Sequence, residues 1–203
     1  MKEQFCIPNW PNPVSSKREQ LITTAISLFA EKGYHDTGID LIAAQAGVTK
    51  RTMYRHFRSK EELILAALRD YDTRFRNNFM KTVESQWRDP RQRLLGIFDA
   101  AYDWFTRDDF YGCMFINAIG EYSETHSAIR ETCKEFKRLM LRYFQRLARE
   151  AGLEHGDELG KQLALLFEGA IVTAQVSKHP EAGHTARQAA AVLIDAAFDS
   201  EEA

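Results

Sequence analysis

One short segment of this chain is rich in side chains suited to binding a nucleic acid. Its key members recur at spacings of three and four residues, so in a helix they would share one face. They are Arg51, Tyr54, Arg55 and Arg58. Guanidinium groups bind phosphate oxygens and the acceptor edge of guanine, and residues 49–60 include no acidic residue to neutralise them. An ordinary solvated helix can carry the same charges, so the neighbouring elements must decide between the two interpretations.

Those neighbours predict two helices joined by a tight turn. A short helix has a narrow apolar face formed by Ile39, Ile42, Ala43 and Ala46. Gly47 allows a tight turn, and Thr49 is a suitable N-cap for a third helix that reaches about Phe57. Met53 and Phe57 would then point into the core, opposite the arginines. A short helix, a glycine turn and a basic helix form the geometry that places a recognition helix in the major groove of DNA.

Helical periodicity extends over almost the whole chain and predicts an all-α fold. A first helix is expected over 17–32, and Gly33 ends it. Ser59 and Glu62 form a capping-box pattern that opens a long fourth helix, from about Lys60 to Val83. Later helices are predicted over 94–105, 112–122, 129–147, 157–177 and 185–198. The fourth helix is long enough to belong to both halves of the molecule.

Composition narrows the class of protein further. Residues 1–60 contain nine Lys/Arg and five Asp/Glu, whereas the rest of the chain contains eighteen and twenty-four. The basic part is therefore N-terminal. The three cysteines, Cys6, Cys113 and Cys133, lack the spacing of a disulfide framework or a structural zinc site, so we expect a reducing cytoplasm and no metal or cofactor. Glu168 interrupts the longest apolar stretch, 163–176, so no membrane segment is expected.

The segment from Ile22 to Leu63 resembles the DNA-binding signature of the tetracycline-repressor (TetR) family. The matching residues are Leu28-Phe29, Gly33-Tyr34, Thr37, Ile39, Ile42-Ala43, Ala46-Gly47-Val48, Thr52, Tyr54, His56-Phe57, Lys60-Glu61 and Leu63. Two residues depart from the family pattern. Gly38 stands where a Ser or Thr cap is usual, and Arg51 stands where a small residue or proline is usual.

The resemblance implies a set of DNA contacts in this chain. They are Thr37 before the second helix, Thr49, Lys50, Arg51, Thr52, Tyr54, Arg55 and His56 in the third, and Lys60 at the start of the fourth. His56 is equally consistent with a packing or capping role. The position of Lys60 at a helix start is poor for the helix dipole, which favours a phosphate partner.

The resemblance also implies the domain organisation and the partners. We expect a flexible arm (1–16), a three-helix helix-turn-helix domain (17–75), and a helical domain that binds a ligand and dimerises (76–203). The last two helices, with their many small residues, would form the interface of a homodimer that binds double-stranded operator DNA as a palindrome. A small-molecule effector of unknown class would release a repressor of this kind from its operator.

Aromatic residues suggest where an effector would bind. Eight of the twenty-five residues from Phe98 to Tyr122 are aromatic, and such surfaces often line pockets, although plain core packing is the commoner reason. The candidates are Phe98, Tyr102, Phe105, Phe110, Met114 and Phe115, with Glu121 and Tyr122 as polar contacts. Cys113, near a predicted helix start, is either a redox sensor or an inert buried residue.

Two other classes of protein were weighed. An enzyme using Cys113, His126 and Glu121 has no support, because a separation of thirteen residues does not bring the first two to one helical face. The chain is therefore not expected to be an enzyme. A DNA-bound factor whose second domain contacts another protein, with no small-molecule effector, stays open as the alternative. The sequence also does not distinguish repression from activation.

Overall fold

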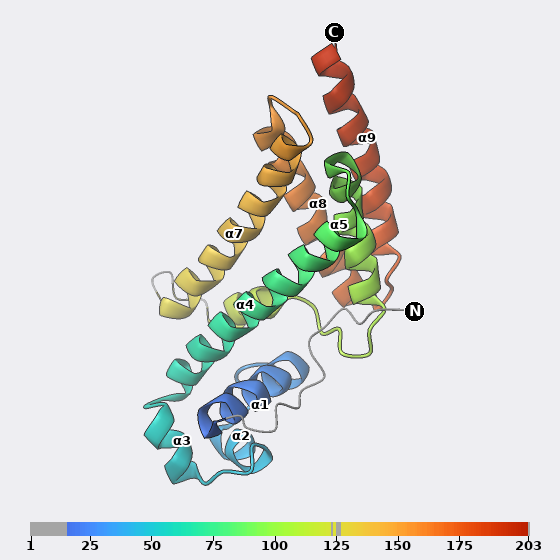
Figure 1. Ribbon diagram of the computed structural model, residues 1–203. Coiled ribbons are helices and arrows are strands. Elements are labelled where there is room, and N and C mark those ends of the chain that lie inside the picture. Colours follow the sequence, from blue (N-terminus) through green and yellow to red (C-terminus); the bar gives the residue numbers. More distant parts are fainter. Residues whose placement is uncertain (1–15, 123, 125–126, 203) are drawn as a thin grey trace. The chain divides into compact units, whose positions relative to one another are not determined.

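The computed structural model describes residues 16–122, 124 and 127–202, and these contain helices and no strand, which confirms the predicted all-α fold. The helices are α1 (Lys17–Lys32), α2 (Ile39–Gln45), α3 (Lys50–His56), α4 (Lys60–Gln86), α5 (Pro90–Phe105), α6 (Met114–Glu121), α7 (Ala128–Glu150), α8 (Gly156–Ser177) and α9 (Ala182–Glu202) (Figure 1). The predicted arm, apart from Ser16, lies outside the described residues, as does His126.

Local capping explains where the first helices begin and end. A reciprocal capping box opens α1, because the Glu19 N–H donates to Ser16 Oγ at 3.2 Å and the Ser16 N–H donates to Glu19 Oε2 at 2.8 Å. Gly33 ends α1 with a φ of 84°, in the region that favours glycine. The predicted box at Ser59 is only half formed, since the Glu62 carboxylate accepts the Arg58 N–H instead of the Ser59 N–H.

The described helices form two compact units. The N-terminal unit holds α1 to α3, α4 up to Phe75, α6, and α7 up to Phe136, whereas the C-terminal unit holds 76–112 and 137–202. The expected boundary after residue 75 therefore lies where α4 passes from one unit to the other. Residues 113–136, which we had assigned to the second domain, group instead with the N-terminal helices.

The aromatic core of the N-terminal unit explains that grouping. Tyr34 is fully buried and stacks on Phe29 with ring centroids 4.8 Å apart. Its hydroxyl donates to the backbone carbonyl of Met114 at 3.0 Å, and this burial raises the pKa of Tyr34 well above its usual value. Phe115 stacks on Phe136 at 3.8 Å. The Tyr34–Met114 hydrogen bond joins residues eighty positions apart, which local sequence patterns do not show.

Helices α4, α7 and α8 contribute aromatic rings to the core of the C-terminal unit. The ring of Phe167 lies 5.4 Å from the rings of both Phe79 and Phe144. Gly160 permits the close approach of α8 to α7, because a Cβ there would lie 2.7 Å from the Cα of Gln145. Glu168, the charge that interrupts the apolar stretch, forms an ion pair with Lys137. Helices α8 and α9 lie side by side (Figure 1).

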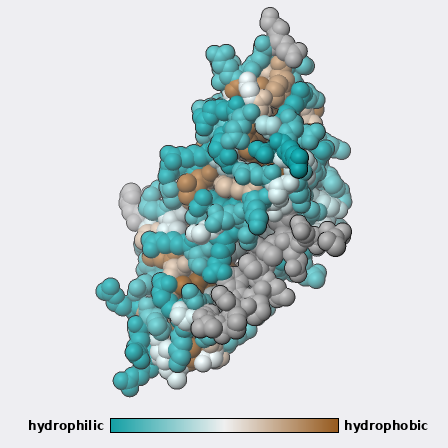
Figure 2. Space-filling model, viewed as in Figure 1, coloured by the Kyte–Doolittle hydropathy of each residue, from teal (hydrophilic) through white to brown (hydrophobic). Residues whose placement is uncertain are grey.

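The surface is consistent with the composition. Hydrophilic residues cover most of the face shown in Figure 2, with small hydrophobic patches between them. Among the described residues, no helix combines the length and the apolar character that crossing a membrane requires.

The buried hydroxyl of Tyr34 predicts an alkaline limit to stability. Below about pH 10 the folded and unfolded states both keep the Tyr34 proton, so its contribution is fully present. Above that pH the unfolded state releases the proton while the folded state, with its raised pKa, retains it. The free energy of unfolding should therefore fall as pH rises, and Tyr34→Phe should lessen this fall while costing about 1 kcal/mol at neutral pH. Urea unfolding at a series of pH values measures both effects, and equal pH slopes for the two proteins would contradict this account.

Candidate nucleic-acid interface

The turn between α2 and α3 has the tight geometry expected from its glycine. Gly47 adopts a φ of 65°, and the N–H groups of Gly47 and Val48 donate to the carbonyls of Ala44 and Ala43 at 3.1 and 3.0 Å. Thr49 then caps α3, because its hydroxyl accepts the Thr52 N–H at 3.1 Å. The two threonine hydroxyls also lie 2.9 Å apart, so each already has a partner within the protein.

Helix α3 buries one side and exposes the other. Met53 and Phe57 are 0% and 1% exposed, and the Arg18 guanidinium lies 5.1 Å from the centre of the Phe57 ring. The opposite side carries three members of the predicted basic face, Arg51, Tyr54 and Arg55, all exposed to solvent as expected. Arg58, the fourth predicted member, is also exposed but is not part of the helix face, because α3 ends at the exposed His56 and the backbone of Phe57 is extended.

Several cations near this face are held by groups of the protein. Lys50 forms an ion pair of 2.9 Å with Asp40 of α2, and this hydrogen-bonded carboxylate raises the pKa of Lys50. Lys60 donates to the carbonyl of His35 at 3.2 Å, and its partial burial lowers its pKa. The Arg58 backbone N–H donates to Glu62 at 2.7 Å, with the guanidinium 3.9 Å from the same oxygen.

Thr37, which was predicted to contact DNA, does not belong to the exposed set. It is 0% exposed, and its hydroxyl donates to the carbonyl of Gly33 at 2.7 Å and approaches that of Leu28 at 3.3 Å. The hydroxyl satisfies carbonyls at the end of α1, where the chain leaves the helix. Thr37 therefore holds the start of α2 in place, and a contact between Thr37 and DNA stays a prediction.

Glu121, predicted as a polar ligand contact, instead binds the turn that follows α1. Its carboxylate accepts the N–H of Tyr34 at 2.8 Å and the N–H of His35 at 2.6 Å, and it lies 3.1 Å from Nδ1 of His35. The ring of Tyr122, the other predicted polar contact, lies 5.0 Å from the ring of His35. We name this set of contacts the Glu121 clamp. It fastens the end of α6 to the turn between α1 and α2, and sequence patterns gave no sign of it.

The aromatic residues predicted to line a pocket are divided between the two units. Phe98, Tyr102, Phe105 and Phe110 belong to the C-terminal unit, and Met114, Phe115, Glu121 and Tyr122 belong to the N-terminal unit. All but Tyr102, Glu121 and Tyr122 are buried. Phe110 packs against Phe105 at 4.9 Å, and Tyr102 stacks on His184 at 3.9 Å. These contacts indicate core packing as their main role, and pocket lining stays a prediction.

Cys113 is the N-cap residue of α6 and is 4% exposed, while Cys133 is 0% exposed. Such burial favours the inert interpretation of Cys113, because reactive thiolates usually lie where solvent reaches them. Within the described residues, no group of three His, Cys, Asp or Glu side chains is placed to hold a metal ion.

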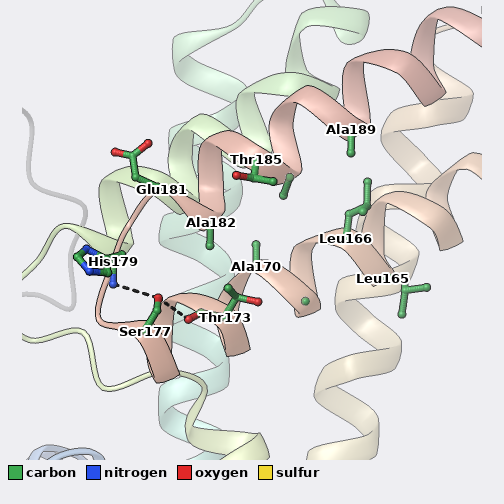
Figure 3. Close-up of a pocket in the computed structure, with 12 residues that line it drawn as sticks. Leu165, Leu166, Ala170, Thr173, Ser177, His179, Glu181, Ala182, Thr185 and Ala189 are labelled. Atoms are coloured by element: carbon green, nitrogen blue, oxygen red, sulfur yellow. Dashed lines mark hydrogen bonds between the residues drawn. The ribbon is translucent and has the colours of Figure 1, made fainter.

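A surface groove lies between α8 and α9, where the sequence indicated close helix packing. Its volume is about 440 Å³, and its lining combines Leu165, Leu166, Ala170 and Ala189 with the polar side chains of Thr173 and Thr185 (Figure 3). The same two helices expose large apolar side chains: Leu165 is 75% exposed, Val176 80% and Val192 69%. The spacing of Leu165, Val172 and Val176 along α8 is helical, so this second apolar face was visible in the sequence.

Two family models match the chain. Residues 21–67 match the model for bacterial regulatory proteins of the tetR family, and residues 90–190 match a tetracyclin repressor-like C-terminal domain. The first match covers the capped helices, the turn and the basic face described above.

Individual relatives agree with these matches. The chain is 33% identical over 149 residues to the HTH-type transcriptional activator FasR of Mycolicibacterium smegmatis, covering 70% of this chain and 64% of FasR. It is 29% identical over 96 residues to the HTH-type transcriptional repressor KstR2 of the same species, covering 47% of this chain and 46% of KstR2. The matched stretches thus span less than two thirds of these relatives.

Solved structures are similar over most of the chain. A TetR-family transcriptional regulator from Streptomyces coelicolor superposes with a TM-score of 0.81 at 27% identity, covering 89% of this chain and 95% of that one. A tetR-type regulator from Streptomyces avermitilis gives a TM-score of 0.77 at 28% identity, covering 91% and 99%.

The Glu121 clamp predicts slow hydrogen exchange at two backbone amides. Each hydrogen bond to the carboxylate is worth about 1.5 to 3 kcal/mol when the acceptor is charged. In Glu121→Gln the acceptor is neutral, so the Tyr34 and His35 amides should exchange about tenfold faster or more. Glu124→Gln, which removes an exposed carboxylate of the same segment, is the control. Unchanged exchange at both amides in Glu121→Gln would show that the clamp is not formed in solution.

Proposed function

Because the chain belongs to the TetR family of bacterial regulatory proteins, we propose that it is a ligand-responsive transcription regulator that binds a palindromic operator as a homodimer. The observation that carries the proposal is the exposed basic face of α3, opposite the buried Met53 and Phe57 and capped by Thr49. A face of this kind matches the phosphates and base edges of a major groove.

DNA binding should depend on Arg51 and Arg55 and on salt. An Arg51→Ala/Arg55→Ala protein loses two exposed positive charges per monomer, so its affinity for operator DNA should fall at least tenfold, with a flatter dependence on salt. Lys60→Ala should lower the salt slope by about one counterion per monomer. Anisotropy titrations at several salt concentrations measure both effects.

The matched control is Arg142→Ala, which removes an exposed arginine from the C-terminal unit. Its operator affinity and salt slope should equal those of the wild-type protein. Undiminished binding by the Arg51/Arg55 double variant would rule out α3 as the DNA-binding helix.

Dimerisation through α8 and α9 is supported by their exposed apolar side chains and by the groove between them. Leu165, Val172 and Val176 recur at helical spacing along α8, and two copies related by a two-fold axis would cover these exposed apolar side chains. Ala174 and Ala190, two of the small residues of these helices, are 1% and 0% exposed within the protomer. They pack inside the protomer and are unsuitable for the test, because a charge there would disrupt folding directly.

Exposed residues of α8 give a cleaner test of the dimer. Leu165→Glu and Val176→Glu would bury an unpaired charge only in the assembled dimer, so both should shift the protein towards monomer and weaken operator binding. Ser85→Glu, an exposed site on α4, is the control. Sedimentation of the wild-type protein as a monomer at micromolar concentration would contradict the proposed interface.

Release of a repressor by an effector is the second part of the proposal. Helices α4 and α7 each contribute residues to both units, and the Glu121 clamp fastens α6 to the turn after α1. A ligand that binds residues 76–203 and shifts these helices would alter the placement of α3. Such a ligand must bind the DNA-incompetent state more tightly, since only differential affinity shifts an equilibrium.

Reciprocity makes the effector proposal testable. A compound found by a thermal-shift screen should bind the protein more weakly when operator DNA is present, by the same factor by which it weakens DNA binding. Calorimetric titration of the compound with and without operator measures that factor. Equal affinities, or a screen without any binder, would favour the alternative of a DNA-bound factor whose second domain contacts another protein.

A further inference from the structure

The cationic side chains around α3 differ in whether another group of the protein binds them. This difference assigns them separate roles in the binding of DNA. Lys50 is paired with Asp40, Lys60 donates to the His35 carbonyl, and Arg58 lies beside Glu62. Lys50 and Lys60 are therefore directed by a hydrogen-bonded partner in the protein, whereas the Arg58 side chain is 95% exposed and its guanidinium lies 3.9 Å from Glu62. Lys50, Lys60 and Arg58 are suited to neutralising phosphates. This role requires a positive charge near the backbone of the DNA, and the side chain needs little freedom to reorient.

Arg51 and Arg55 are different. Both are exposed, and within the described part of the chain neither guanidinium has a hydrogen bond or an ion pair. Their positions differ by four residues, so they lie on one side of α3 about 6 Å apart along the helix axis. A guanidinium with no internal partner keeps all its donors for a bound molecule.

The position of Arg51 within α3 selects it from the pair. It is the second residue of the helix, directly after the Thr49 cap and Lys50. In helix-turn-helix proteins the N-terminal residues of the recognition helix contact base edges. An arginine that reaches the floor of the major groove pairs best with guanine, whose O6 and N7 accept both of its parallel N–H donors.

We infer that Arg51 reads one guanine in each half-site of the operator, and that Arg55, one turn further along, contacts the DNA backbone. This inference rests on the proposed function, because it requires α3 to lie in a major groove. It goes beyond that function by naming the base and the atoms that are recognised. Tyr54 lies between Arg51 and Arg55 in the sequence and is 47% exposed. It can contact the DNA without changing the roles of the two arginines.

The first experiment is selection of binding sites from a random double-stranded DNA library by the full-length wild-type protein and by Arg51→Ala, Arg55→Ala and Arg142→Ala. The wild-type, Arg55→Ala and Arg142→Ala proteins should select the same palindrome with an invariant guanine in each half. Arg51→Ala should select the palindrome with that one position randomised.

The second experiment tests the atoms involved. Replacing the selected guanine by another base in one half-site should weaken wild-type binding about 5- to 150-fold, the range expected for one bidentate contact. Replacing it by 7-deazaguanine, which lacks the N7 acceptor, should also weaken wild-type binding. Arg51→Ala should bind all three DNAs with nearly equal affinity.

The outcomes separate the inference from the proposed function. If the wild-type protein selects no sequence, the proposed function fails. If it selects a palindrome and Arg51→Ala retains the same preference at every position, the proposed function stands and the reading of guanine by Arg51 is overturned. Loss of preference in Arg55→Ala instead would assign the base contact to Arg55 and would equally overturn the inference.

Discussion

The N-terminal unit depends on one carboxylate. Glu121 accepts the N–H groups of Tyr34 and His35, two donors left without helical partners where α1 ends at Gly33. A glycine turn with a positive φ can end a helix, but it does not orient the next one. The Glu121 clamp supplies that orientation, together with the Thr37 hydroxyl on the carbonyls of the same turn. Residues 113–136 thereby belong to the unit that holds α2 and α3.

On the proposed DNA-binding surface, some cationic side chains have a partner within the protein and others do not. Asp40, Glu62 and the His35 carbonyl each direct one neighbouring cation, while Arg51 and Arg55 are left to solvent on the face opposite Met53 and Phe57. In the proposed complex, the held cations would give affinity for any phosphate backbone, and the free guanidinium groups would distinguish bases. The two free guanidinium groups both lie on α3, seven residues of helix with a cap at one end and a buried aromatic residue at the other.

Much of this architecture was predictable because it is local. The capping box at Ser16, the stop at Gly33, the turn at Gly47 and the two faces of α3 each depend on residues within one or two helical turns. The Glu121 clamp was not predictable, since its partners lie 86 and 87 positions apart. Periodicity also shows only that a face is apolar. It therefore identified Ala174 and Ala190 as small residues of a packed helix, but not which side of the helix faces the protomer's own core.

The central claim is that the turn after α2 and the exposed face of α3 form the DNA-binding surface. The most direct measurement is amide hydrogen exchange on the full-length protein, free and bound to its selected operator. We predict that binding slows exchange within residues 47–60, with smaller changes along α8 and α9. Unchanged exchange in residues 47–60, with protection confined to another part of the chain, would contradict the account.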